Sequence, residues 1–150
     1  MTRHWMYLLA VMMLVVATSV SGSAQQESID ELRAKAEQGD SISQFELGLA
    51  YETGRGVPED GIEAARWYRL AAEQGYVDAQ YNLALMYANG RGVPQNDVMA
   101  YAWWSVSAAQ GHENARENRD RILKRLTAEQ RAKGQEIATR CFKSGYKDCN

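Results

Sequence analysis

Residues 47–58 read LGLAYETGRGVP, and residues 83–94 repeat this pattern 36 positions later as LALMYANGRGVP. A second motif has the same spacing: Ala-Glu-Gln-Gly occurs at 36–39 and 72–75, and Ala-Ala-Gln-Gly follows at 108–111. When 39–74 is aligned with 75–110, 14 of the 36 positions are identical. A period of this length is typical of repeat proteins in which each unit is one supersecondary element.

The first half of each unit predicts an amphipathic helix. Leu47, Ala50 and Tyr51 lie at positions i, i+3 and i+4, and apolar residues occupy the same positions one period later. This spacing places the apolar side chains on one side of a helix. The first helices are therefore expected over 41–53 and 77–89.

Glycine and polar residues mark where the helices end and begin again. Gly54 and Gly90 follow the first helices and suit left-handed C-caps. Asp60 and Asn96 suit N-caps of the second helices, and Glu63 would complete a capping box with Asp60. The second helices are expected over 61–74 and 97–110, with a buried face made of Ala64, Trp67, Ala71, Ala100 and Trp103.

Both ends of the repeat region need a cover, because a helix pair in a solenoid buries its apolar face only against a neighbour. Residues 28–38 predict an N-terminal capping helix. Residues 113–126 continue the repeat in a degenerate, highly charged form. Thr127, with Gln130 three residues on, predicts the start of a last helix that ends near residue 142.

Residues 1–24 have the organisation of a secretory signal peptide. Arg3 begins a positive segment, an apolar run follows, and Gly22 and Ala24 satisfy the small-residue rule for cleavage before Gln25. The apolar run is shorter than the roughly 20 residues of a spanning helix, and the alternative is an uncleaved N-terminal anchor. Cleavage predicts a periplasmic or secreted protein without stable membrane insertion.

The two cysteines, Cys141 and Cys149, both lie near the C-terminus. In an oxidising compartment they are expected to form a disulfide, the alternatives being free thiols or an intermolecular bridge. The expected division of the chain is a signal peptide at 1–24, an N-terminal capping helix at 25–40, two repeats at 41–112, and C-terminal capping helices with a cysteine-containing tail at 113–150.

Composition excludes several classes of function. The chain has 150 residues and a formal net charge of −2, which gives no electrostatic support for nucleic-acid binding. It has two histidines, and since His4 lies in the expected leader, only His112 is left in the mature chain. A metal site with several histidines is therefore excluded within one subunit, and we expect neither a metal nor a cofactor.

The motifs together resemble the Sel1-like repeat, a relative of the tetratricopeptide repeat. The resemblance rests on residues 80–94, QYNLALMYANGRGVP, and on residues 64–75, AARWYRLAAEQG. It is strong over 39–112 and weak over 113–126. It implies an all-α fold, a right-handed α/α superhelical solenoid, and a non-catalytic role as an adaptor that binds another protein or a peptide.

The resemblance also implies where a partner would bind. Ligand-facing positions in the related tetratricopeptide repeat lie at fixed offsets on the first helix of each unit, and helical spacing puts them on one face. Several are apolar, which suits a peptide or a partner helix, although burial under the flanking helices is the alternative. Carried over to this chain, the positions are Phe45, Leu49, Glu52, Tyr81, Leu85 and Asn89.

An aromatic cluster in the second repeat offers one further candidate. Tyr101 stands where the first repeat has Ala65, so an exposed ring could anchor a partner. The alternative, which we favour, is packing against the C-terminal helices. Trp104, which replaces Tyr68, is expected to be partly buried between repeats.

An envelope hydrolase acting on cell-wall or β-lactam material is the alternative function. His112 and Glu113 are the histidine–carboxylate pair that such chemistry could use, but the sequence nominates no nucleophile beside them. A surface turn is the simpler interpretation of these two residues. We therefore expect a protein-binding module of the cell envelope rather than an enzyme.

Overall fold

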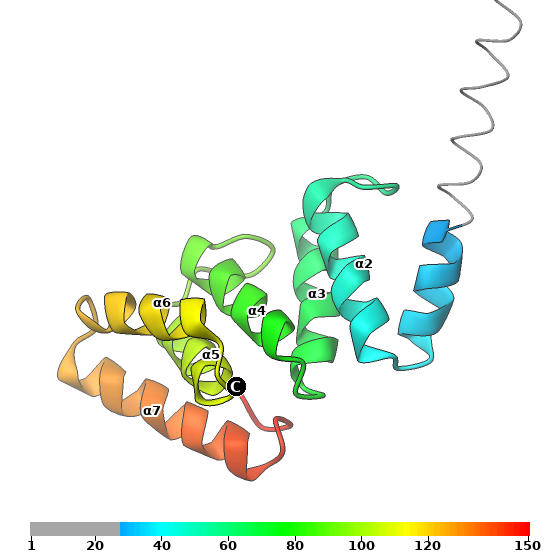
Figure 1. Ribbon diagram of the computed structural model, residues 1–150. Coiled ribbons are helices and arrows are strands. Elements are labelled where there is room, and N and C mark those ends of the chain that lie inside the picture. The colour runs from blue at the N-terminus through cyan, green and yellow to red at the C-terminus, as the bar shows by residue number, and fades with distance from the viewer. Residues whose placement is uncertain (1–27) are drawn as a thin grey trace, which may run out of the picture.

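The computed structural model describes residues 28–150, and in this span the secondary structure is helical, without strands (Figure 1). The expected signal peptide at 1–24 lies outside the described residues. A helix at 28–37 comes first. It is followed by α2 (Ser41–Thr53), α3 (Gly61–Ala72), α4 (Val77–Asn89), α5 (Asp97–Ala109), α6 (Glu113–Leu123) and α7 (Ala128–Lys143).

The helix ends follow the local chemistry of the sequence. Gly54 and Gly90 cap α2 and α4 with φ of 69° and 65°, in the left-handed region that glycine adopts without steric cost. The side chains of Asp60 and Asn96 accept backbone N–H bonds at the starts of α3 and α5. These four predictions are confirmed.

The capping box expected at Asp60 and Glu63 does not form, whereas one forms at the predicted start of the last helix. Thr127 and Gln130 form the reciprocal pair at the start of α7. Glu63 instead forms an ion pair with Arg66, 2.8 Å away and three residues along the helix, so Asp60 caps α3 alone. An arginine within reach on the same helix competes for the carboxylate that a capping box would use.

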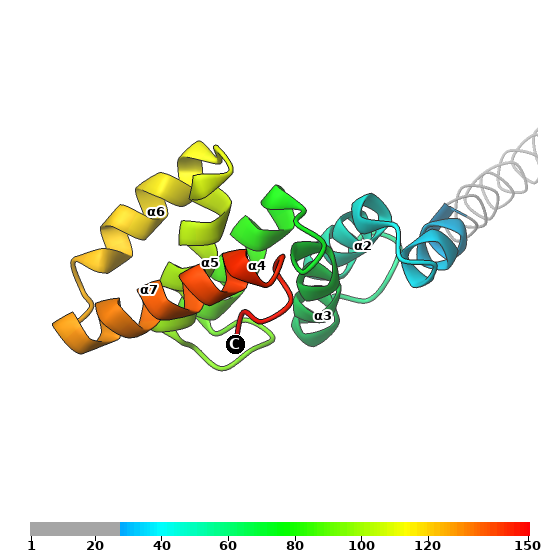
Figure 2. The same cartoon turned by 90° about the horizontal axis from the view of Figure 1, so that it is seen from below.

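The helices stack as a solenoid. Within each repeat α2 packs on α3 and α4 on α5, and between units α3 packs on α4 and α5 on α6. The helix at 28–37 closes the N-terminal end, where Ile29 and Ala36 are buried. The expected all-α arrangement of two helix pairs between capping helices is confirmed (Figures 1 and 2).

The last helix departs from the repeat pattern. α7 packs on α5 and not chiefly on α6. Gly134 allows this, since a Cβ at this position would come within 2.5 Å of the Tyr101 ring. Arg119 of α6 stands where α4 has the fully buried Leu83, and a charged side chain at this position disfavours a tight α6–α7 pair.

The core consists mainly of alanine and aromatic side chains. Small residues let the helices approach closely, and large rings fill the space between them. Trp103 and Tyr68 are the largest fully buried side chains. All residues expected on the buried face of the second helices are buried: Ala64, Trp67, Ala71, Ala100 and Trp103.

Polar contacts recur with the repeat and connect one unit to the next. Buried Gln44 donates to the carbonyl of Ala36 at 3.1 Å, and Gln80 donates to that of Ala72 at the same distance. These bonds satisfy carbonyl groups at the C-terminal ends of the preceding helices. Two further pairs repeat in register, namely Gln74–Gln44 with Gln110–Gln80, and Arg33–Tyr51 with Arg69–Tyr87.

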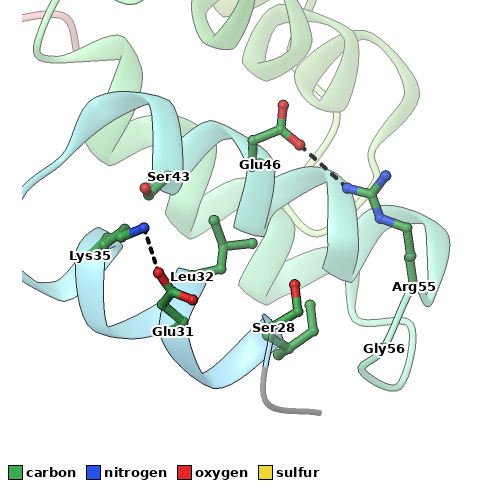
Figure 3. Close-up of a pocket in the computed structure, with 9 residues that line it drawn as sticks. Ser28, Glu31, Leu32, Lys35, Ser43, Glu46, Arg55 and Gly56 are labelled. Carbon is green, nitrogen blue, oxygen red and sulfur yellow. Dashed lines mark hydrogen bonds and ion pairs between the residues drawn. The ribbon is translucent and has the colours of Figure 1, made fainter. Parts of the chain in front are cut away.

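The N-terminal helix also contacts the first glycine loop. Figure 3 shows the shallow pocket between them, with Lys35 paired to Glu31 and Arg55 to Glu46. Gly56 of the loop lies against buried Ile29, which a Cβ would approach within 2.6 Å.

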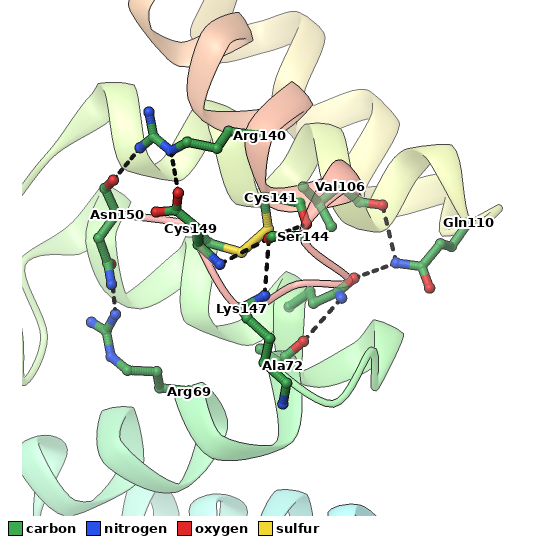
Figure 4. Close-up of a disulfide and its surroundings, with 12 residues drawn as sticks. Arg69, Ala72, Val106, Gln110, Arg140, Cys141, Ser144, Lys147, Cys149 and Asn150 are labelled. Atoms are coloured by element: carbon green, nitrogen blue, oxygen red, sulfur yellow. Dashed lines mark hydrogen bonds and ion pairs between the residues drawn. A yellow bond between two sulfur atoms is a disulfide. The ribbon is translucent and has the colours of Figure 1, made fainter.

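The C-terminal tail turns back from α7 toward the first repeat (Figure 4). Cys141 and Cys149 form a disulfide with their Cα atoms 4.4 Å apart, as predicted, and Cys149 is buried. Beyond it, the Asn150 side chain accepts a hydrogen bond from Arg69 of α3 at 2.9 Å. The disulfide loop therefore links the last helix to the first repeat.

Over residues 28–150, none of the helices has both the length and the apolar character that crossing a bilayer requires.

Candidate functional site

A groove opens between α4 and α6, the first helices of consecutive units. Its volume is about 450 Å³. Tyr81, Leu85 and Asn89, three of the expected partner-binding residues, line it from α4. The other lining residues are Ala88, Trp104, Asn118, Arg121, Ile122 and Arg125.

The groove has an apolar floor and a polar rim. Trp104 and Ile122 are buried at the bottom, with 5 % and 4 % of their surface exposed. Leu85 is half-buried on the wall. Arg121 and Arg125 are exposed at the edge. An apolar surface with a few polar groups around it is the usual construction of a binding site.

Tyr81 is held in place from two sides. Its ring stacks on His112, with centroids 4.5 Å apart, and its hydroxyl accepts a hydrogen bond from Asn118 at 3.3 Å. Asn118 in turn accepts a bond from Arg121, also at 3.3 Å. The wall of the groove is therefore ordered before any partner arrives, which lowers the entropic cost of binding.

Arg125 is fixed by an ion pair across the end of the groove. Its guanidinium lies 2.8 Å from Asp97, in the first turn of α5. This pair leaves Arg121 as the rim cation without a carboxylate within 4 Å in the part of the chain that is described.

The three expected residues of the first repeat are differently placed, because internal contacts engage them. Phe45 packs with Tyr68 and Tyr76, at centroid distances of 5.8 and 5.0 Å. Leu49 is half-buried and packs against the main core. Glu52 accepts a 2.5 Å hydrogen bond from Tyr68 and pairs with Arg91 at 3.3 Å.

Burial raises the pKa of Tyr68 well above its ordinary value, and the bond to the Glu52 carboxylate adds to the effect. The phenol therefore stays protonated and keeps donating to Glu52. Glu52 and Tyr68 stand at the positions that Ala88 and Trp104 occupy in the lining of the groove, 36 residues later.

Tyr101 does not present the exposed ring that its role as a partner-binding residue would require. Its side chain is buried under Gly134 of α7, with 9 % of its surface accessible. The alternative of packing against the C-terminal helices is therefore correct, and Tyr101 has no free ring to anchor a partner. Trp104 is more deeply buried than expected, since it forms the floor of the groove.

His112 and Glu113 hold the start of α6. The Nδ1 atom of His112 accepts from the backbone N–H of Ala115 at 3.1 Å, and Nε2 lies 3.4 Å from Asp78. Glu113 forms an ion pair with Arg116. Both ring nitrogens are engaged in structural contacts, so the arrangement is that of an N-cap.

Ser144 and Lys147 have the Ser-x-x-Lys spacing of penicillin-recognising enzymes, which bears on the hydrolase alternative. The Ser144 hydroxyl donates to the carbonyl of Cys141 at 3.0 Å and accepts from the backbone N–H of Lys147 and Asp148 (Figure 4). It therefore closes the turn after α7. Over residues 28–150 no group of three or more histidine, cysteine or acidic residues could hold a metal ion.

Sequence reasoning missed the half of the groove that α6 contributes. A signal was present in the register, because Arg121 and Arg125 stand 36 positions after Leu85 and Asn89. These two arginines lie in the degenerate sequence of α6, so an alignment of the two full repeats alone does not include them.

Comparison with known proteins identifies the same repeat in this chain and in similar solved structures. The Sel1 repeat model matches residues 41–76 and 77–112. One similar solved structure is c5321, a protective antigen of uropathogenic Escherichia coli strains with an SLR fold, at 32 % identity and a TM-score of 0.76 over 81 % of this chain and 27 % of that one. Another is a Sel1 repeat protein from Oxalobacter formigenes, at 34 % identity and a TM-score of 0.59 over 73 % of this chain and 96 % of that one. This chain thus spans about a quarter of c5321. No curated protein matched.

Proposed function

Because the chain belongs to the Sel1 repeat family, whose repeats generally mediate protein–protein interaction, we propose that it is a non-catalytic binding module that holds a peptide or partner protein in the groove between α4 and α6. The observation that carries the proposal is the convergence of Tyr81, Leu85 and Asn89 on one ordered groove. His112 and Ser144 support a non-catalytic role, since their polar atoms cap helices and turns.

The proposed place of action is the bacterial cell envelope. The signal-like sequence at 1–24 supports export, and a disulfide suits an oxidising compartment. Fractionation of the source cells, with N-terminal sequencing of the mature protein, tests this part. A chain recovered intact from the cytoplasm contradicts it.

Binding is tested by capture from an envelope extract with the immobilised protein. Leu85→Asp places a charge on the groove wall, whereas Leu70→Asp places one on the exposed surface of α3 and serves as the control. Both variants must show wild-type helicity by circular dichroism. We expect Leu85→Asp to lose the proteins that the wild type and Leu70→Asp retain. Equal retention by all three would place binding elsewhere.

A further inference from the structure

We propose that the α4–α6 groove selects a segment in which an acidic side chain lies next to a large apolar side chain. The proposal rests on the binding function above and names the chemistry of the partner. The acidic side chain would pair with Arg121 at the rim, and the apolar side chain would lie on Leu85 and Trp104.

The groove exists because the sequence departs from its own repeat at this place. Glu52 of the first repeat corresponds to Ala88 in the second, which removes both bulk and negative charge. Leu85 corresponds to Arg121 in α6, which brings a positive charge. At the first junction the Glu52 side chain is bonded to Tyr68, whereas at the second the corresponding Ala88 and Trp104 line the groove.

Arg121 has donors left for a partner. A guanidinium has five N–H groups, and the structure uses one side of it, Nη1, in the 3.3 Å bond to Asn118. Two acidic residues of this region are already paired, Asp97 with Arg125 and Asp120 with Arg119. Glu113 and Glu117 of α6 do not line the groove.

The wider charge distribution favours the same partner. Residues 28–97 contain 12 acidic and six basic residues, whereas residues 98–150 contain six acidic and ten basic ones. The stretch 119–125, RDRILKR, alone has four basic residues and one acidic. An acidic segment is therefore attracted to the C-terminal end of the solenoid and repelled by its N-terminal end.

The apolar floor sets the second requirement. The Leu85 side chain and the Trp104 ring offer contact area beside the guanidinium, and Tyr81 is already ordered. A carboxylate held against such a surface is partly removed from water, which strengthens its pairing with arginine. An acidic residue without an apolar neighbour would gain only the weak attraction of a surface ion pair.

The test uses a library of random peptides displayed without a free C-terminus, which is selected on the protein with its disulfide intact. We expect the retained peptides to be enriched in Asp or Glu next to Leu, Phe or Trp. A selected peptide, resynthesised with an amidated C-terminus, is then measured against matched variants of the protein. Arg121→Gln should weaken its binding about tenfold, which corresponds to about 1.4 kcal/mol, and salt should weaken wild-type binding in the same direction.

Arg116→Gln is the matched control, because Arg116 lies exposed on the same helix but outside the groove, and this variant should bind as the wild type does. Retained peptides without acidic enrichment, or equal binding by Arg121→Gln, would overturn the acidic preference while leaving the groove a binding site. If the retained peptides bind the Leu85→Asp variant as tightly as the wild type, the groove is not the binding site, and the proposed function is overturned as well. Sedimentation of the free protein completes the test: self-association that Arg121→Gln abolishes would identify the occupant as a second copy and overturn the proposal.

Discussion

At the scale of single residues, Gly92 shows how closely the loops approach the helices. Its φ is +68°, and a Cβ would lie 1.8 Å from the backbone oxygen of Gly61, at the start of α3. The loop of the second repeat thus rests directly on the backbone of the first. A side chain at this position would push two units apart.

Gly92→Ala should therefore destabilise the protein by about 3 kcal/mol, since it adds a backbone clash to the strain of a positive φ. Gly111→Ala is the control, because Gly111 has φ of +95° but open space around it, so only about 1 kcal/mol of strain is expected. Urea unfolding of both variants measures the difference. Equal losses would mean that the loop moves aside at little cost.

Tyr68 makes the stability of the folded protein sensitive to alkaline pH. Its pKa in the folded protein lies well above the ordinary tyrosine value of about 10, because the phenol is buried and donates a hydrogen bond to Glu52. Folding therefore favours the protonated form. The corresponding stability is present below pH 10 and is lost as the pH rises through the folded pKa.

Tyr68→Phe should lower stability at pH 7 by about 1 kcal/mol through loss of the hydrogen bond. Above pH 10 the wild type should lose stability more steeply than the variant, so the two curves converge. Thermal unfolding between pH 7 and 11 provides the measurement. Parallel curves would show that Tyr68 does not supply the alkaline sensitivity.

At the scale of elements, the helices of the two full repeats could be predicted to within two residues, because local signals and the period agree there. Gly54, Gly90, Asp60 and Asn96 each act through their own backbone or side chain, so neighbouring residues suffice to recognise them. The observed second helices end slightly earlier than expected, at Ala72 and Ala109. The last turn of a helix is where such boundaries are least defined.

The arrangement of α6 and α7 could not be predicted in the same way. The sequence of α6 is visibly degenerate, but the consequence for packing depends on contacts across the fold. Arg119 removes an apolar contact from α6, and Gly134 gives α7 a close approach to Tyr101 instead. The same holds for the groove. Its α4 half follows from the repeat register, whereas its α6 half depends on which charged side chains of α6 lie beside α4.

The glutamines that connect the units lead to a prediction at this scale. Gln80 has none of its surface exposed, donates to the carbonyl of Ala72, and accepts from Gln110 at 2.6 Å. Gln80→Leu keeps the size but removes one bond from the Ala72 carbonyl, which keeps the Gly75 N–H, and one from the Gln110 amide, which keeps the Val106 carbonyl. The expected cost is about 2 kcal/mol. Gln95→Leu removes an exposed bond of the same type to Ala88 and should cost less than 0.5 kcal/mol, or about a quarter as much. Chemical unfolding measures the stability of both variants. A similar loss of stability in both would contradict the view that Gln80 connects one unit to the next.

At the scale of the whole molecule, the disulfide tail connects parts that are far apart in the chain. Asn150 contacts Arg69, 81 residues away, and the Tyr146 ring lies against Gly75. These contacts hold the C-terminal end against the first repeat, so the stack is restrained at more than its consecutive interfaces.

Replacing both cysteines, Cys141→Ser with Cys149→Ser, should lower stability by about 2.5 kcal/mol through the freed chain entropy. Hydrogen exchange should also become faster over 69–76, where the tail docks, but not over 28–37, which the tail does not touch. Unchanged exchange over 69–76 would mean that the tail stays docked without its covalent bond.

The docked tail also restricts how an array of this kind could grow. Arg69 and Gly75, which receive the tail, lie in the first of the two full repeats, and their counterparts 36 positions on, in the second full repeat, are Ser105 and Gly111. An inserted copy of residues 41–76 would again offer the tail an arginine, whereas an inserted copy of residues 77–112 would offer it a serine. An array lengthened by copies of the first repeat could therefore keep its C-terminal tail docked on an arginine. An array lengthened by copies of the second repeat could not.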